Sequence, residues 1–107
     1  MPIVPNANST PVEMLPGVIR RTITDGDRMM LCEVRMEAGA VVPLHTHPHE
    51  QTGYLVSGRC RFRLGDESRE LSPGDCWMVP GGAEHEATAL EPSVFVDVFS
   101  PPREEYR

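Results

Sequence analysis

The segment GAVVPLHTHPHEQTGYLVSG, residues 39–58, decides which fold we expect for this chain of 107 residues. It places His45, His47 and His49 close together, with Gln51 two positions further on. Residues two positions apart in a β-strand point to the same side. His45 and His47 therefore direct two imidazoles at one point if their strand lines a cavity. The segment predicts β-structure that carries metal ligands.

The last of the four histidines, His85, offers a third imidazole from a distant segment, at the start of another strand pattern. Three imidazoles and the amide oxygen of Gln51 suit Zn, Ni, Fe, Mn or Co and leave positions for water or substrate. We predict one divalent transition metal ion at these side chains. For His49, which follows Pro48, we favour a place at the rim of the site, with ligation of the metal as the alternative.

The sequence on both sides of this segment has a period of two. Met30, Cys32, Val34 and Met36 alternate with more polar residues, and Gly39 ends the run. Similar short patterns bounded by Gly, Pro or Asp turns occur at residues 54–57, 59–64, 76–79, 83–89 and 93–100. No helical periodicity extends beyond two turns, so we predict an all-β sandwich or barrel of antiparallel strands.

The chain is long enough for one domain with one core. Residues 1–17 contain four prolines and few large apolar side chains, which predicts an extended arm. Residues 18–107 then form the barrel and a short C-terminal tail. The cysteines, Cys32, Cys60 and Cys76, include no CxxC pair, and we interpret them as reduced core thiols.

Charge and hydropathy argue against several kinds of partner. The formal net charge is −6, and no cluster of cations offers a surface for nucleic acid or an anionic membrane. No apolar run has the length of a membrane span, and no charged segment followed by an apolar one opens the chain. We therefore expect a soluble, cytoplasmic protein that binds neither nucleic acid nor membrane.

The strand pattern at residues 93–100 places Phe95, Asp97 and Phe99 on one face and the intervening valines on the other. Two interpretations of Asp97 remain open. On an exposed outer face the carboxylate is simply solvated. On a face that lines the cavity, the apolar surroundings raise its pKa and suit it to proton transfer.

The spacing of these residues resembles that of the cupin family. Residues 39–58 match the first cupin motif, with Gln51 where glutamate is usual. Residues 74–89, with Pro80-Gly81-Gly82 and His85, match the second motif, with Ala89 where asparagine is usual. The resemblance implies a double-stranded β-helix, the cupin jelly-roll barrel, with a metal at its centre. It also implies a homodimer in which the N-terminal arm pairs with the partner subunit.

The C-terminal stretch, residues 96–106, is similar to that of the cupin branch that linearises unsaturated uronic acids released by pectate and alginate lyases. Glu105 stands where aspartate is expected. The resemblance implies His45, His47, Gln51 and His85 as metal ligands, and Asp97, Phe99 and Arg103 as catalytic or substrate-binding residues. It implies a small anionic sugar acid as substrate. The expected reaction converts 4,5-unsaturated galacturonate or mannuronate to the linear 4-deoxy-5-keto uronate.

The neutral ligand Gln51 has a consequence for the chemistry. A glutamate ligand would cancel one unit of the metal's charge, whereas glutamine leaves the full +2, which favours an anionic substrate and Lewis-acid chemistry over electron transfer. Two alternatives stay open. One is another metal-dependent cupin enzyme, a dioxygenase or a lyase that acts on a small carboxylate. The other is a cupin that binds a small molecule without catalysis.

Overall fold

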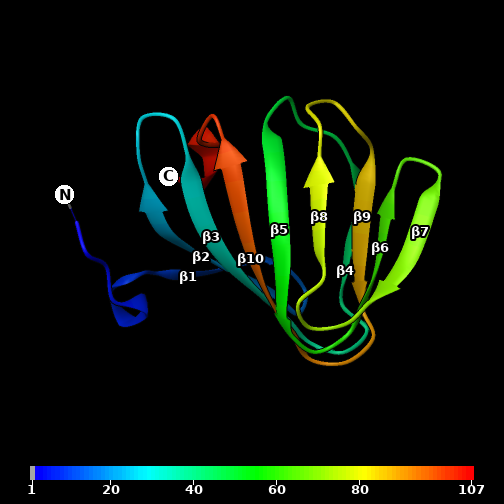
Figure 1. Cartoon of the computed structure of the whole chain (residues 1–107). Coiled ribbons are helices and arrows are strands. Elements are labelled where there is room, and N and C mark those ends of the chain that lie inside the picture. The colour runs from blue at the N-terminus through cyan, green and yellow to red at the C-terminus, as the bar shows by residue number, and fades with distance from the viewer. Residues whose placement is uncertain (1) are drawn as a thin grey trace.

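Two antiparallel sheets face each other in the computed structural model, which describes residues 2–107 (Figure 1). The six-stranded sheet has the order β1 (Pro11–Leu15), β2 (Val18–Asp25), β3 (Met30–Met36), β10 (Ser93–Ser100), β5 (Glu50–Ser57) and β8 (Cys76–Val79). The four-stranded sheet has the order β4 (Val41–His45), β9 (His85–Ala89), β6 (Cys60–Leu64) and β7 (Glu67–Leu71). Two short 3-10 helices, η1 (Asn6–Asn8) and η2 (Glu104–Tyr106), lie near the ends of the chain. The predicted all-β, double-stranded β-helix is confirmed.

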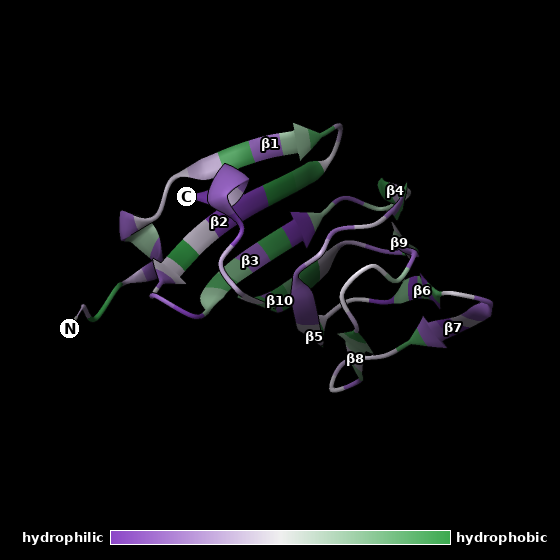
Figure 2. Cartoon of the chain, turned by 90° about the horizontal axis from the view of Figure 1, so that it is seen from above, coloured by the Kyte–Doolittle hydropathy of each residue, from purple (hydrophilic) through white to green (hydrophobic). Residues whose placement is uncertain are grey.

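Period-two patterning accounts for the strands and for the core between the sheets. The alternation of apolar and polar residues is visible along β3 in Figure 2. Side chains of one parity from both sheets form the core: Val18, Met36, Leu55, Cys60, Phe62, Trp77, Val79, Ala89 and Phe95. Burying these apolar side chains is the main source of stability for such a fold.

One cysteine differs from the prediction. Cys32 and Cys60 are buried, as expected, but Cys76 is exposed. In β8, Trp77 and Val79 face the core, so Cys76 and Met78 have the outward parity. The interpretation of Cys76 as a core thiol was wrong because parity was not assigned for this short strand.

Part of the predicted N-terminal arm pairs within its own chain. Residues Pro11 to Leu15 form β1, which runs antiparallel to β2 at the edge of the six-stranded sheet, with Val12 opposite Arg20. The other side of β1 has no strand beside it among the described residues. Pairing of this arm with a partner subunit stays a prediction. No helical segment of residues 2–107 has the length and apolar character that a membrane span requires.

Candidate metal and substrate site

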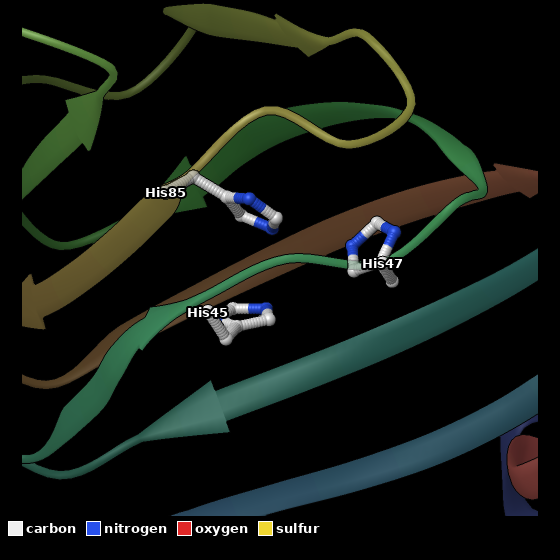
Figure 3. A group of neighbouring side chains, drawn as sticks. All are labelled: His45, His47 and His85. Atoms are coloured by element: carbon white, nitrogen blue, oxygen red, sulfur yellow. The ribbon is translucent and has the colours of Figure 1, made fainter.

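Three histidines meet at one end of the space between the sheets (Figure 3). His45 is the last residue of β4, His85 is the first residue of β9, and these two lie opposite each other in the ladder. His47 lies in the connection between β4 and β5. One ligand atom from each imidazole lies within 4.8 Å of the others. The expectation that His45 and His47 share a strand was wrong, because β4 ends at His45 and a turn brings His47 to the same point.

Backbone carbonyls orient all three rings. The Nδ1 atoms lie 2.8 Å from Pro43 O for His45, 3.0 Å from His49 O for His47, and 2.9 Å from Ala83 O for His85. A carbonyl oxygen only accepts hydrogen bonds, so each Nδ1 donates and each neutral ring keeps its lone pair on Nε2. A hydrogen bond from the ring nitrogen that does not bind the metal is how proteins commonly orient metal-binding histidines.

The protonation state of the rings suits a metal site. Burial lowers the pKa of His85 to about 4 and also lowers the pKa of His47. The positive charge of Arg103 contributes in the same direction for both rings. Metal binding requires neutral imidazole. His85 Nε2 is buried and has no hydrogen-bond partner among the described residues, as expected for a lone pair that awaits a ligand.

Gln51 completes the set from β5. Its Nε2 donates to Asp97 Oδ1 over 2.9 Å, and this hydrogen bond turns its Oε1 toward His47 Nε2, 3.0 Å away. Both of the facing atoms carry lone pairs, so they repel each other unless a cation lies between them. His45, His47, Gln51 and His85 therefore fit a divalent metal ion, on donor chemistry as well as on position.

Asp97 occupies the centre of the inner face of β10. Its side chain is 8% exposed, and Phe95 and Phe99 on the same face are buried as well. Of the two interpretations of Asp97, the structure shows the one in which it faces the cavity. Burial raises the pKa of Asp97 to about 6, although the Gln51 amide, the Trp77 indole N–H and the Arg103 guanidinium favour the charged form.

Arg103 reaches the same cavity from the tail that follows β10. The cavity is lined by His45, Gln51, His85, Asp97, Phe99 and Arg103, among others. The guanidinium Cζ of Arg103 lies 5.3 Å from the centroid of the Phe99 ring, and its Nε pairs with Glu105 Oε1 at 2.8 Å. The ring centroids of His47 and Phe99 are 5.7 Å apart. Six of the seven predicted site residues thus line one cavity, and the seventh, His47, lies against Gln51 and Phe99 at its edge.

Several residues that line the cavity were not predicted from the sequence, and Trp77 and Tyr106 are two of them. The Trp77 ring stacks on Phe62, with centroids 4.6 Å apart. The inward parity of β8 was the available signal for Trp77, whereas nothing in the tail sequence places Tyr106. His49 lies beside His47, with ring centroids 5.6 Å apart, and its carbonyl orients the His47 ring.

Known proteins share both the sequence pattern and the architecture. The family model described as a cupin domain matches residues 32–99. A pectin degradation protein, KdgF of Dickeya dadantii, is 34% identical over 102 residues, which cover 92% of this chain and 93% of that protein. The structure of a KdgF from a Halomonas species has a TM-score of 0.95 and 35% identity, covering 100% of this chain and 99% of that one.

Oxalate decarboxylase OxdC of Bacillus subtilis is more distant. It is 28% identical over 76 residues, which cover 66% of this chain but 20% of that protein. The matched region, the double-stranded β-helix and the histidine cluster between its sheets agree with one another. The chain therefore belongs to the cupin family.

Proposed function

We propose that this protein is a metal-dependent enzyme that opens the ring of 4,5-unsaturated galacturonate and mannuronate monomers. The product is the linear 4-deoxy-5-keto uronate. The observation that carries the proposal is the placement of the Asp97 carboxyl beside the candidate metal ligands, with Arg103 in the same cavity. The similarity to two KdgF proteins over nearly the whole chain supports the substrate class.

The side chains of His45, His47, Gln51 and His85 would hold the metal. When bound there, a divalent ion supplies Lewis acidity that stabilises negative charge developing on a substrate oxygen. Because the four ligands are neutral, the centre keeps a positive charge that favours an anionic substrate.

Asp97 is suited to move the protons of this reaction. The substrate is a cyclic hemiacetal whose C4=C5 double bond is conjugated to a carboxylate. Its ring opens when the C1 hydroxyl loses a proton, C1 becomes an aldehyde and the C1–O5 bond breaks, leaving an enolate at O5. A proton added at C4 then gives the 5-keto acid. Asp97 takes the first proton and returns one at C4, so the reaction is a net isomerisation.

Arg103 and Phe99 are suited to hold the substrate. A guanidinium presents a planar fork of donors that matches a carboxylate, and Arg103 lies at the cavity with its guanidinium beside the Phe99 ring. Phe99 offers an apolar wall for one face of the sugar. The two side chains together orient the ring with its carboxylate fixed.

The test is a direct assay. The purified metal-loaded protein, added to 4,5-unsaturated galacturonate, should speed the loss of the ultraviolet absorbance of the conjugated double bond. NMR should identify the 4-deoxy-5-keto acid as product. Heat-denatured protein gives the spontaneous rate. A rate no faster than this background would overturn the proposal and favour a cupin enzyme that acts on another small carboxylate.

A further inference from the structure

Arg103 is held in place by the C-terminal tail rather than by a strand. It follows the end of β10 at Ser100, and its Cζ lies 4.2 Å from the centroid of the Tyr106 ring. The backbone N–H of Tyr106 donates to Arg103 O over 3.0 Å, which closes η2 onto this residue. The position of the Arg103 guanidinium at the cavity therefore depends on where Tyr106 lies.

Tyr106 is docked on β2, a strand that supplies none of the predicted metal ligands or catalytic residues. The Thr22 hydroxyl donates to Tyr106 O over 2.6 Å. The Cζ of Arg20 lies 4.2 Å from the centroid of the Tyr106 ring. Next to it, Arg107 pairs with Asp25 at 3.0 Å. The tail is thus attached to β2 through the ring and the backbone carbonyl of Tyr106 and through the neighbouring Arg107.

Arg20 is an unusual residue for the inner face of a β-sheet. Its side chain is 9% exposed, and its Nε is buried without a hydrogen-bond partner. No carboxylate of residues 2–107 lies within ion-pair distance of it. A buried charge without a partner is costly. The face of the Tyr106 ring offers the compensating contact, a cation–π interaction.

From these contacts we infer that Arg20 and Tyr106 are positioning residues for Arg103. Arg20 fixes the Tyr106 ring, and the ring supports the Arg103 guanidinium at the cavity, where it binds the carboxylate of an anionic ligand. The identity of that ligand rests on the proposed function, whereas the contacts between the three side chains do not. In this arrangement the buried Arg20 serves ligand binding through Tyr106 and Arg103 rather than packing alone.

Kinetics with 4,5-unsaturated galacturonate test the inference. Arg20→Gln and Tyr106→Leu should each raise KM on the order of tenfold with kcat nearly unchanged, because they disturb ground-state binding. Tyr106→Phe keeps the ring and should restore the original KM. In a protein that already carries Arg103→Ala, Tyr106→Leu should not raise KM further, because the effects of substitutions at residues that act through one another are not additive. If Tyr106→Leu raised KM by the same factor with and without Arg103, the inference would be overturned.

Arg21→Gln is the matched control for charge. Arg21 is the next residue of β2 and points the other way, where its Nη1 donates to Ser9 O over 2.6 Å. The Arg21→Gln substitution should leave KM unchanged. Metal content should be the same in all variants, which separates loss of Arg103 positioning from loss of the metal site.

Proteolysis tests the contacts without any substrate. Trypsin cleaves after arginine, and release of residues 104–107 by cleavage after Arg103 is measured by mass spectrometry. Arg20→Gln and Tyr106→Leu should release this peptide on the order of tenfold faster than the unchanged protein, since local opening exposes the bond. If the variants released the peptide no faster than the unchanged protein, the positioning inference would be overturned. If they released it faster but the unchanged protein did not turn over the unsaturated galacturonate, only the proposed substrate would be overturned.

Discussion

Asp97 and Gln51 form one hydrogen-bonded unit, and this determines which substitutions are informative. Gln51 Nε2 donates to Asp97 Oδ1 over 2.9 Å, and the amide thereby presents its oxygen to the site. An asparagine at position 97 has an oxygen that accepts the same hydrogen bond. The substitution removes the acid–base group and leaves the ligand orientation in place.

We therefore expect Asp97→Asn to lower kcat on the unsaturated uronate by a factor on the order of 10², as is typical for loss of a general acid or base. Metal content and melting temperature should change little. Steady-state absorbance assays and elemental analysis measure these outcomes. Asp66→Asn, at an exposed turn, is the control. A fully active Asp97→Asn protein would contradict the role of this carboxyl.

Gly53 lies between Asp97 of β10 and Trp77 of β8 in one row across the sheet. A Cβ at this position would overlap the indole ring of Trp77, which crosses the glycine. We expect Gly53→Ala to destabilise the protein by about 2 kcal/mol through overpacking. Urea unfolding measures the loss, and Trp77, the one tryptophan of the chain, reports the displacement by fluorescence.

The control for Gly53→Ala is Gly26→Ala, where the nearest atom to an added Cβ is Met29 O at 3.7 Å. A similar loss of stability in both proteins would point to glycine flexibility as the cause and not to the contact with Trp77.

At the scale of elements, the candidate metal site joins β4, the turn after it, β5 and β9. These segments belong to two different sheets. A ligand that binds only the folded state stabilises it by mass action, by about 2.7 kcal/mol at a hundredfold excess over Kd. The metal should therefore hold the two sheets together at this end of the barrel.

Removal of the metal with a chelator should lower the melting temperature by roughly 10 °C for a domain of this size. The double change His45→Ala, His47→Ala should abolish metal binding and make the melting temperature insensitive to the chelator. Calorimetry and elemental analysis provide the readouts. Undiminished metal in the double variant would show that the ion is bound elsewhere.

At the scale of the whole molecule, the outer face of the six-stranded sheet exposes several large apolar side chains. Tyr54 and Val56 on β5 are each 47% exposed, and Met78 on the neighbouring β8 is 45% exposed. Contiguous apolar surface of this kind marks interaction sites. We propose that the protein is a homodimer, with this face and the N-terminal arm as its two candidate contacts.

Sedimentation velocity at micromolar concentration should show a dimer. Val56→Glu places a charge in the apolar face, and deletion of residues 1–10 removes the arm up to β1. The variant that shifts the protein to monomer identifies the contact. Arg61→Glu, on the exposed side of β6, is the control for an added negative charge. Monomers in the unchanged protein would contradict the proposal.

The sequence by itself predicted the all-β class, most strand positions and the cluster of His45, His47, Gln51 and His85. It did so because period-two patterning and the spacing of histidines and turns are local properties of the chain. Parity also predicted that Asp97 shares a face with two phenylalanines, but not which face is interior. That question depends on what packs against the strand, as does the exposure of Cys76.

Only the tertiary structure decided which distant residues support the site. His45 and His47 meet through a turn and not along one strand, because β4 ends where its ladder with β9 ends. Thr22 and Tyr106 are 84 positions apart in the chain and are joined by one hydrogen bond. Tyr106 reaches the cavity, and Arg20 contacts the Tyr106 ring, through such long-range packing, which leaves no local pattern in the sequence.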